Sequence, residues 1–361
     1  MTTEDISGWL AVVAAALPPA KVVSLWQAMG SADAILAASP RDLSSAGLTP
    51  AEQARLAAAA RKDYSSDLKL LERLNASLVT LADFAYPSNL RQLPDHPAVL
   101  FVRGKFEAQD ARAVALVGTR NASPYGRTAA QSLARDLARN GVTVVSGLAR
   151  GIDSCAHEGA LEAQGRTIGV MACGIDVPYP RESQPLVRRI VEGGAGAVIS
   201  EFPPGFPPMA RNFVQRNRLI SGLALGVVVV EAPEKSGAII TANWAAEQDR
   251  QVFAVPGSIN SLYSRGCHAL IRDGAAVCTG VADILEELNL PVVAEHEEPK
   301  RPQLTGEEEK LLSLLSLEQK NVEELIQSTS FSSAQVASTL MVMELRGLVR
   351  RLPGNYFVRV R

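Results

Sequence analysis

The stretch Leu225-Gly-Val-Val-Val-Val-Glu231 decides the fold class of this 361-residue chain. Four consecutive valines leave no polar residue to face solvent, which indicates a strand that is buried on both faces, as in a parallel sheet. The segment that leads into it, Ile199–Ala224, contains a proline-rich loop followed by Arg211, Arg216 and Arg218 with no acid among them. We therefore expect a basic loop and helix beside a buried strand, at a place where an anion could bind.

Further apolar runs of the same character lie on both sides of this stretch. They cover Ala113–Val117, Val142–Val145, Thr167–Met171, Ala197–Ile199, Gln251–Val255 and Ala275–Cys278. Helical patterns separate them. Strands without polar alternation, separated by helices, predict a Rossmann-like α/β fold with a doubly wound, mostly parallel sheet. We expect this domain to span residues 81–290, with a connector that ends in a strand at Val99–Val102.

The two ends of the chain follow different patterns. Residues 1–80 contain short helical segments with stop and cap signals, which predict a small helical domain resembling SAM or helix-hairpin-helix modules. A generic interaction role is favoured there over contact with a DNA backbone. Residues 291–302 are charged and flanked by prolines, which indicates a linker. Residues 303–361 predict three helices and a hairpin, a winged helix, with protein contact and DNA contact as open alternatives.

Composition excludes several classes of protein. The formal net charge is −2, so any nucleic-acid site has to come from local clustering of basic residues. The four cysteines are far apart and form no disulfide or zinc pattern, so no metal site is predicted. The N-terminus has no basic segment, and its apolar run Trp9–Leu17 is too short to span a bilayer. We expect a cytoplasmic protein without membrane contact.

The first loop after a strand runs from Gly118 to Gly126 and contains Thr119, Arg120 and Ser123. Doubly wound sheets bind ligands at the carboxyl ends of their strands, so this loop is a candidate site. Gly118 allows a tight exit, and the helix that follows directs its amides at a phosphate. Arg120 stands where a dinucleotide pyrophosphate needs open space. We therefore expect an arginine-assisted phosphate site and no NAD, FAD or other cofactor.

The second loop begins with Ser146 and Gly147 and ends at Asp153, shortly before His157 and Glu158. A catalytic His157 with one of these acids is conceivable, but Asp153 as a cap of the following helix is favoured. The chain contains no Walker sequence and no nucleophile paired with a base. We therefore expect a site that binds rather than reacts, and no catalytic residue is assigned.

Phe213 lies between Arg211 and Arg216, and Asn217 and Arg218 follow directly. Arginine forks hold phosphates bidentately, and an aromatic ring offers a face on which a base can stack. This combination is typical of sites for single-stranded nucleic acid. The alternative interpretation is that Phe213 belongs to the core and the arginines are solvated.

The loop after the valine strand continues this edge of the sheet. It reads Glu231-Ala-Pro-Glu-Lys-Ser-Gly-Ala-Ile-Ile-Thr241, in which Ser236 and Gly237 begin a helix and Thr241 lies about one turn further on. We expect this helix to open onto the same crevice as Gly118 and Arg120.

Several motifs occur in a fixed order within residues 85–285. They are Gly118-x-Arg120 with Ser123-x-Tyr125-Gly126, Ser146-Gly-Leu-Ala-Arg-Gly-Ile-Asp153, Gly174-Ile-Asp176 with Tyr179-Pro180, Ser200-Glu-Phe-Pro-Pro-Gly205, Phe213 with Arg216-Asn-Arg-Leu-Ile-Ser-Gly222, Ser236-Gly237 with Ile240-Thr-Ala242, and Phe253-Ala-Val-Pro-Gly-Ser258. Together they closely resemble the DNA processing protein A family, DprA, also called Smf.

The resemblance implies a single-stranded DNA-binding protein that forms a homodimer through its Rossmann-like domain. It also implies loading of the recombinase RecA during natural transformation, with displacement of single-strand-binding protein. Arg120 would hold a phosphate, Arg216 and Arg218 would line the path of the strand, and Phe213 would contact a base. The DNA-binding residues predicted in this way are Gly118, Thr119, Arg120, Ser123, Ser146, Gly147, Arg211, Phe213, Arg216, Asn217, Arg218, Ser236, Gly237 and Thr241.

The chain departs from the family pattern at two positions. Ala210 stands where many members carry a lysine three positions before the aromatic residue, so Arg211 would have to replace it. Asp249 stands where a glycine is usual. Two other functions stay as alternatives: a nucleoside-monophosphate phosphoribohydrolase-like enzyme, and a nucleotide sensor. The enzyme's Pro-Gly-Gly-x-Gly-Thr loop is replaced here by Lys235-Ser-Gly-Ala-Ile-Ile-Thr241, which lacks the double glycine.

Overall fold

The computed structural model describes residues 3–292, 304–316 and 319–359. The chain divides into two compact units, Met1–Val293 and Ala294–Arg361. Nearly all of the predicted linker, residues 291–302, lies outside the described residues. Each unit is described by itself below.

The first unit begins with short helices, as the sequence predicts. They are α1 (Thr3–Ala14), α2 (Pro19–Met29), α3 (Ala32–Ala37), α4 (Pro40–Ser45), α5 (Pro50–Ala59) and α6 (Ser65–Arg73). Thr49 and Glu52 form a capping box at the start of α5, which satisfies amides that the helix itself leaves unpaired. Buried residues of this region, among them Trp9 and Leu25, belong to the same hydrophobic cluster as Phe101 of the sheet. The helical region therefore packs onto the sheet and shares its core.

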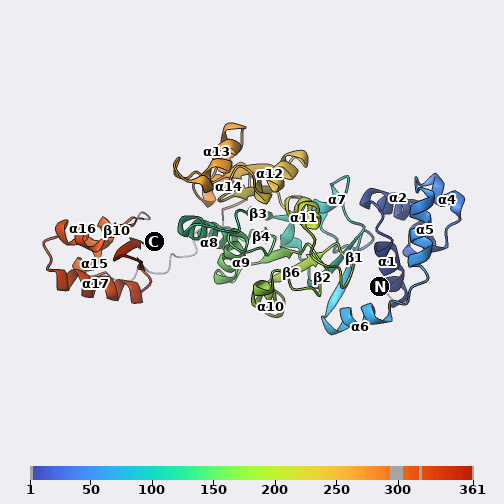
Figure 1. The fold of residues 1–361 in the computed structure, drawn as a ribbon, viewed down its shortest axis with the longest axis horizontal. Helices are drawn as coiled ribbons and strands as arrows, with labels where there is room; N and C mark the ends of the chain where they lie inside the picture. Colours follow the sequence, from blue (N-terminus) through green and yellow to red (C-terminus); the bar gives the residue numbers. More distant parts are fainter. Residues whose placement is uncertain (1–2, 293–303, 317–318, 360–361) are drawn as a thin grey trace. The chain divides into compact units, whose positions relative to one another are not determined.

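A nine-stranded sheet forms the centre of the first unit (Figure 1). Its strands are β1 (Ala76–Thr80), β2 (Val99–Gly104), β3 (Ala113–Val117), β4 (Thr143–Ser146), β5 (Thr167–Val170), β6 (Gly196–Ser200), β7 (Gly226–Val229), β8 (Gln251–Ala254) and β9 (Ala276–Val277). The order across the sheet is β1-β2-β6-β5-β4-β3-β7-β8-β9. Strands β3 to β9 pair in parallel, whereas β2 is antiparallel to β6 and β1 to β2. The mostly parallel, doubly wound sheet is confirmed.

Strand β1 differs from the prediction, which assigned residues 1–80 to a helical domain and began the sheet domain at residue 81. The strand pairs Ala76 with Arg103 and Thr80 with Val99 in an antiparallel ladder. It is five residues long and lies at the edge of the sheet. An edge strand this short carries little periodic signal in the sequence.

Helices cover both faces of the sheet. They are α7 (Ser88–Arg91), α8 (Pro124–Arg139), α9 (Ile152–Glu162), α10 (Gln184–Glu192), α11 (Ala210–Leu223), α12 (Gly237–Glu247), α13 (Arg265–Arg272) and α14 (Val281–Glu287), with short 3-10 turns at Ala108–Ala111, Arg181–Ser183 and Leu262–Ser264. Strand β3 shows why the sequence lacks polar alternation: Val114 and Leu116 face a core built with α8 and α9, while Ala115 and Val117 face a core built with α11 and α12.

The strand order places a crevice at a defined point of the sheet. From β3 the chain winds outward through β4 and β5 to β6, and then returns to the other side of β3 with β7. Neighbouring strands whose connections run in opposite directions leave a crevice at their carboxyl ends. Here that point lies between β3 and β7. Helix α11, the connection from β6 to β7, contacts β5, β4 and β3 on its way and brings its side chains to this crevice.

The second unit confirms the winged helix. Its elements are α15 (Gly306–Leu314), β10 (Lys320–Asn321), α16 (Val322–Gln327), α17 (Ser333–Leu345), β11 (Val349–Leu352) and β12 (Tyr356–Arg359). Capping boxes at Thr305 and Ser332 begin α15 and α17. Strand β10 adds a third strand to the expected hairpin, in the order β10-β12-β11.

Candidate functional site

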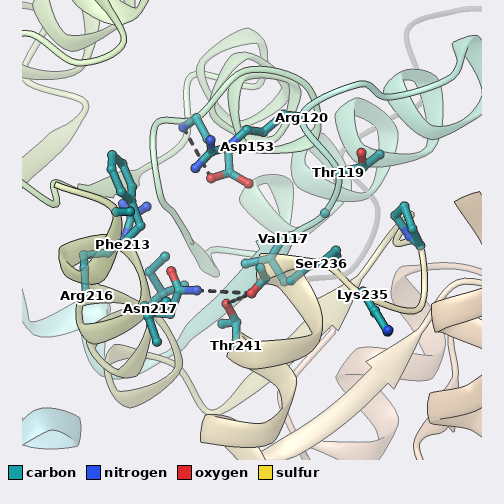
Figure 2. A pocket seen from close by; sticks show the side chains of 18 of the residues that line it. Val117, Thr119, Arg120, Asp153, Phe213, Arg216, Asn217, Lys235, Ser236 and Thr241 are labelled. Atoms are coloured by element: carbon teal, nitrogen blue, oxygen red, sulfur yellow. Dashed lines mark hydrogen bonds between the residues drawn. The ribbon is translucent and has the colours of Figure 1, made fainter. Parts of the chain in front are cut away.

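A pocket lies at the crevice between β3 and β7 (Figure 2). Its volume is about 630 Å³, which is within the usual range for a ligand site. Nine of the predicted site residues line it: Gly118, Thr119, Arg120, Phe213, Arg216, Asn217, Ser236, Gly237 and Thr241. They come from the exit of β3, from α11 and from the start of α12. The structure thus brings together segments that lie more than a hundred residues apart in the sequence.

The exit of β3 is tied closely to its neighbours. The Thr119 amide donates a hydrogen bond of 2.7 Å to the carbonyl of Glu231, at the end of β7. A Cβ on Gly118 would lie 2.4 Å from Ile152 and 2.8 Å from the same Glu231 carbonyl, so only glycine fits there. The backbone therefore leaves β3 in a tight turn that presents Arg120 at the mouth of the pocket.

Arg120 and Phe213 form one wall of the pocket. The Arg120 guanidinium carbon lies 5.3 Å from the centroid of the Phe213 ring, within the range of a cation–π contact. Tyr179 packs on the same ring, with the two centroids 5.3 Å apart. Within the described residues, Arg120 has no ion-pair partner, and its side chain is exposed. This wall combines an aromatic ring with an uncommitted cation.

Arg216 is buried at the back of the pocket, with 4% of its surface exposed. Its Nη1 donates to the carbonyl of Gly147, at 2.7 Å, and to that of Val170, so it joins the exits of β4 and β5. Burial lowers the pKa of Arg216 to about 10, which still leaves it cationic at neutral pH. Its buried Nε has no hydrogen-bond partner among the described residues. A Cβ on Gly147 would lie 2.8 Å from the guanidinium, which explains the glycine there.

The start of α12 forms another wall. The Asn217 amide and the Thr241 hydroxyl each donate 3.1 Å hydrogen bonds to the Gly237 carbonyl, which fixes α12 against α11. Ser236 occupies the N-cap position but makes no capping hydrogen bond, and its buried Oγ has no partner in residues 3–292, 304–316 and 319–359. The α12 amides at this end thus keep their donors directed toward the pocket.

Predicted residues outside the pocket support the fold around it. The Ser123 hydroxyl donates to the buried Glu231 carboxylate and accepts from the Gly126 amide, which caps α8. The buried Ser146 hydroxyl donates to the Leu116 carbonyl and joins β4 to β3. Gly147 makes room for Arg216 as described above.

Arg218 does not line the pocket, contrary to the expectation that it follows the path of a DNA strand. It is 3% exposed and forms a buried ion pair with Glu201, together with a 2.9 Å hydrogen bond to the Asp95 carbonyl. The period of an α-helix explains the difference, because Arg216 and Asn217 share a face with Phe213, whereas Arg218 and Arg211 point away from it. Arg211 is exposed and also lies outside the pocket lining.

The structure assigns structural roles to the residues weighed as a catalytic pair. His157 is fully buried and contacts the Thr167 hydroxyl at 2.6 Å, rather than Asp153 or Glu158. Burial lowers its pKa to about 3, so it is neutral near pH 7. Asp153 was expected to cap α9, but the N-cap of this helix is Gly151, which makes no side-chain hydrogen bond. The Asp153 carboxylate accepts from the amides of Gly147 and Ala149, which shapes the loop after β4.

Sequence reasoning did not assign Lys235 or Tyr179 to the site, although both line the pocket. Lys235 lies in the loop predicted to continue this edge of the sheet, and Tyr179 belongs to a motif of the family resemblance, so both positions carried a usable signal. Asp249, which replaces a glycine of the family pattern, adopts a φ of 55°. It therefore keeps the left-handed backbone for which glycine is favoured.

Comparisons with known proteins identify the family. The family model described as DNA recombination-mediator protein A matches residues 77–289, more than half of the chain. The chain belongs to the DprA family. A second family model, the DprA winged helix domain, matches residues 295–355. Protein Smf of Escherichia coli is 38% identical over 326 residues, which cover 88% of this chain and 87% of that protein.

Two solved structures of DprA proteins are similar in fold. The structure of DprA from Streptococcus pneumoniae has a TM-score of 0.68 and 31% identity, over 80% of this chain and 98% of that chain. A structure of DNA processing protein A from Helicobacter pylori, reported for its single-stranded DNA binding mode, has a TM-score of 0.52 and 30% identity over 59% of this chain and 96% of that chain. A search of the described helices found none long and apolar enough to cross a membrane.

Proposed function

We propose that the chain binds single-stranded DNA in the pocket between β3 and β7. One observation carries the proposal: the exposed Arg120 guanidinium lies 5.3 Å from the Phe213 ring at the mouth of the pocket. An aromatic face next to a cation suits a base and its phosphate, and base–aromatic stacking tolerates any base sequence. The reported single-stranded DNA binding by the Helicobacter pylori relative supports the same function.

The charges around the pocket support an anionic ligand. Three cationic side chains line it, Arg120, Arg216 and Lys235, against one carboxylate, that of Asp153. That carboxylate is held by two backbone amides beside Arg216. The local excess of positive charge explains how a chain with a formal net charge of −2 can hold a polyanion. Gly118, Thr119, Asn217, Ser236, Gly237 and Thr241 contribute backbone and neutral polar groups to the same surface.

The finer part of the proposal concerns partners. We also propose that this chain, a member of the DNA recombination-mediator family, passes the bound strand to RecA during natural transformation and displaces single-strand-binding protein. We include a homodimer formed through the Rossmann-like domain in this proposal. Strand exchange by RecA, started on oligothymidine coated with single-strand-binding protein, tests the proposed transfer of the strand to RecA. Stimulation by the wild-type chain that is absent with the Arg120→Glu variant is the expected result.

The enzyme alternative has less support from the pocket. Asp153 is the one carboxylate among the lining residues, and two amides hold it in place. No second acid or histidine of that lining stands ready for general acid–base work. Incubation with nucleoside monophosphates tests whether the chain hydrolyses them. Release of free base at enzymatic rates would support the enzyme and contradict the proposed DNA-binding function. Competition by the intact mononucleotides without hydrolysis would favour the nucleotide sensor.

The binding site is tested with Arg120→Glu and labelled oligothymidine. The variant removes a charge-assisted phosphate contact and adds repulsion, so we expect affinity to fall by about 3 kcal/mol or more. Fluorescence anisotropy at several salt concentrations measures the loss, and a duplex of the same length should bind more weakly than the single strand.

Arg188→Glu is the matched control, because Arg188 is exposed on α10 and does not line the pocket. It makes the same change of net charge at another place. Equal losses for both variants, or no loss for Arg120→Glu, would show that the strand does not lie in the pocket.

A further inference from the structure

The pocket has a second basic wall, across from Phe213. Figure 2 shows Phe213 and Lys235 on opposite sides of the pocket. Lys235 comes from the loop after β7, whereas Phe213 and Arg216 come from α11. Ala210, at the start of α11, also lines the pocket and contributes no charge. Many members of the family carry a lysine at this position. The lysine of this pocket therefore stands on the α12 side.

Lys235 is exposed, and within the part of the chain that the structure describes it has no acidic partner. Lys235 precedes Ser236, which occupies the N-cap of α12. The buried Ser236 Oγ has no hydrogen-bond partner within the same described part of the chain. A buried hydroxyl without a partner is costly and points to a ligand that completes it.

The α12 amino end supplies the remaining donors. This helix has 11 residues and no side-chain cap, so its first amides are open to the pocket. A Cβ built on Gly237 would meet nothing within 4 Å, so the protein leaves open space beside the first residue of α12. Amides at a helix amino end and a nearby cation are the usual means of holding a phosphate.

The carboxylate that lines the pocket, that of Asp153, does not belong to the start of α12. Asp153 belongs to α9, where it accepts from Gly147 and Ala149 and lies beside Arg216. Glu234 is next to Lys235 in sequence, but it is exposed and is not among the lining residues. An anion at the start of α12 thus meets a lysine, a hydroxyl and amides.

We propose that Lys235, the Ser236 hydroxyl and the amino end of α12 form a second phosphate subsite. The pocket then holds two phosphates of one DNA strand, the first at Arg120 beside Phe213 and the second at Lys235. A volume of about 630 Å³ leaves room for a nucleoside between them. This inference rests on the proposed binding of single-stranded DNA and specifies which groups take the phosphates.

The experiment compares the salt dependence of oligothymidine binding in Lys235→Gln with that of the wild type. Each phosphate neutralised on a single strand adds about 0.7 to the slope of log K against log salt. We expect Lys235→Gln to lower that slope by about 0.7 and Lys235→Arg to restore it. Ser236→Ala removes a neutral donor, so it should weaken binding by about fivefold and leave the slope unchanged.

Lys69→Gln is the matched control, because Lys69 is exposed on α6 and lies outside the pocket lining. Its slope should equal that of the wild type. An unchanged slope for Lys235→Gln, or an equal change for Lys69→Gln, overturns the second subsite. If Arg120→Glu still abolishes binding in that case, the proposed function stands and only the subsite fails. A wild-type chain that does not bind oligothymidine overturns both.

Discussion

The exit loop of β3 and the helix α11 each contribute arginines that the sequence assigned to one DNA-binding surface, yet the two regions use them differently. Arg120 in the loop is exposed and lies over the Phe213 ring. Arg216 and Arg218 in α11 are buried, and each is committed to groups of the protein. A cation that the fold has already paired with protein groups has fewer donors left for a ligand. The comparison thus distinguishes an arginine that is available to bind DNA from arginines that stabilise the structure around the pocket.

The largest effect is expected for Arg218→Met. This change leaves the Glu201 carboxylate buried without its partner, which costs about 3–5 kcal/mol of unfolding free energy. Urea unfolding followed by tryptophan fluorescence measures it, since Trp9, Trp26 and Trp244 all lie in the first unit. The oligothymidine affinity of the folded protein should stay at the wild-type value.

The double variant Arg218→Met with Glu201→Leu is the control for this interpretation. It removes the unpaired charge, so much of the lost stability should return. A single variant of normal stability that binds DNA weakly would instead place Arg218 on the path of the strand.

The burial of His157 should make the free energy of unfolding depend on pH. The Thr167 hydroxyl donates to the Val144 carbonyl, so it accepts from Nδ1 of His157. The Nε2 atom is buried and has no partner among the residues that the structure describes. Burial lowers the pKa of His157 in the folded state to about 3. Between this value and the ordinary pKa of about 6.5, His157 is protonated in the unfolded chain but not in the folded chain. Stability is therefore full above about pH 6.5 and falls as the pH drops toward 3.

The expected loss from His157 between pH 7.5 and pH 5 is about 2 kcal/mol. Urea unfolding of the wild type and of His157→Gln at both pH values measures this loss. The variant should be less stable at pH 7.5 but should lack this part of the pH dependence. Equal pH dependence in the two proteins would mean that His157 takes up its proton in the folded state.

The smallest effect is expected for Arg211→Ala. Arg211 is exposed and points away from Phe213 on the helix, so its loss should change oligothymidine affinity by less than about twofold. Ala210→Lys is the informative partner, because Ala210 lines the pocket. It should raise affinity and increase the salt slope by about 0.7. A loss of about tenfold or more in Arg211→Ala would show that Arg211 replaces the lysine of the family pattern.

Much of the fold followed from local patterns. The apolar runs of β3 to β8 predicted buried parallel strands, and chain connectivity then placed their exit loops at one edge of the sheet. The helix starts at Thr305 and Ser332 in the winged helix are also local, because each capping box joins residues only three positions apart. Strand β1 escaped prediction because its identity depends on pairing with β2 rather than on its own composition.

The sequence by itself determined the fold class, the family and the loops that surround the pocket, since each of these depends on residues close together in the chain or on motifs in order. Only the tertiary structure decided which cations remain available. Whether Arg218 meets Glu201, and whether Lys235 faces the same pocket as Phe213, depends on how separate elements pack. Charge and residue type are properties of the sequence, but pairing and burial are properties of the packed core.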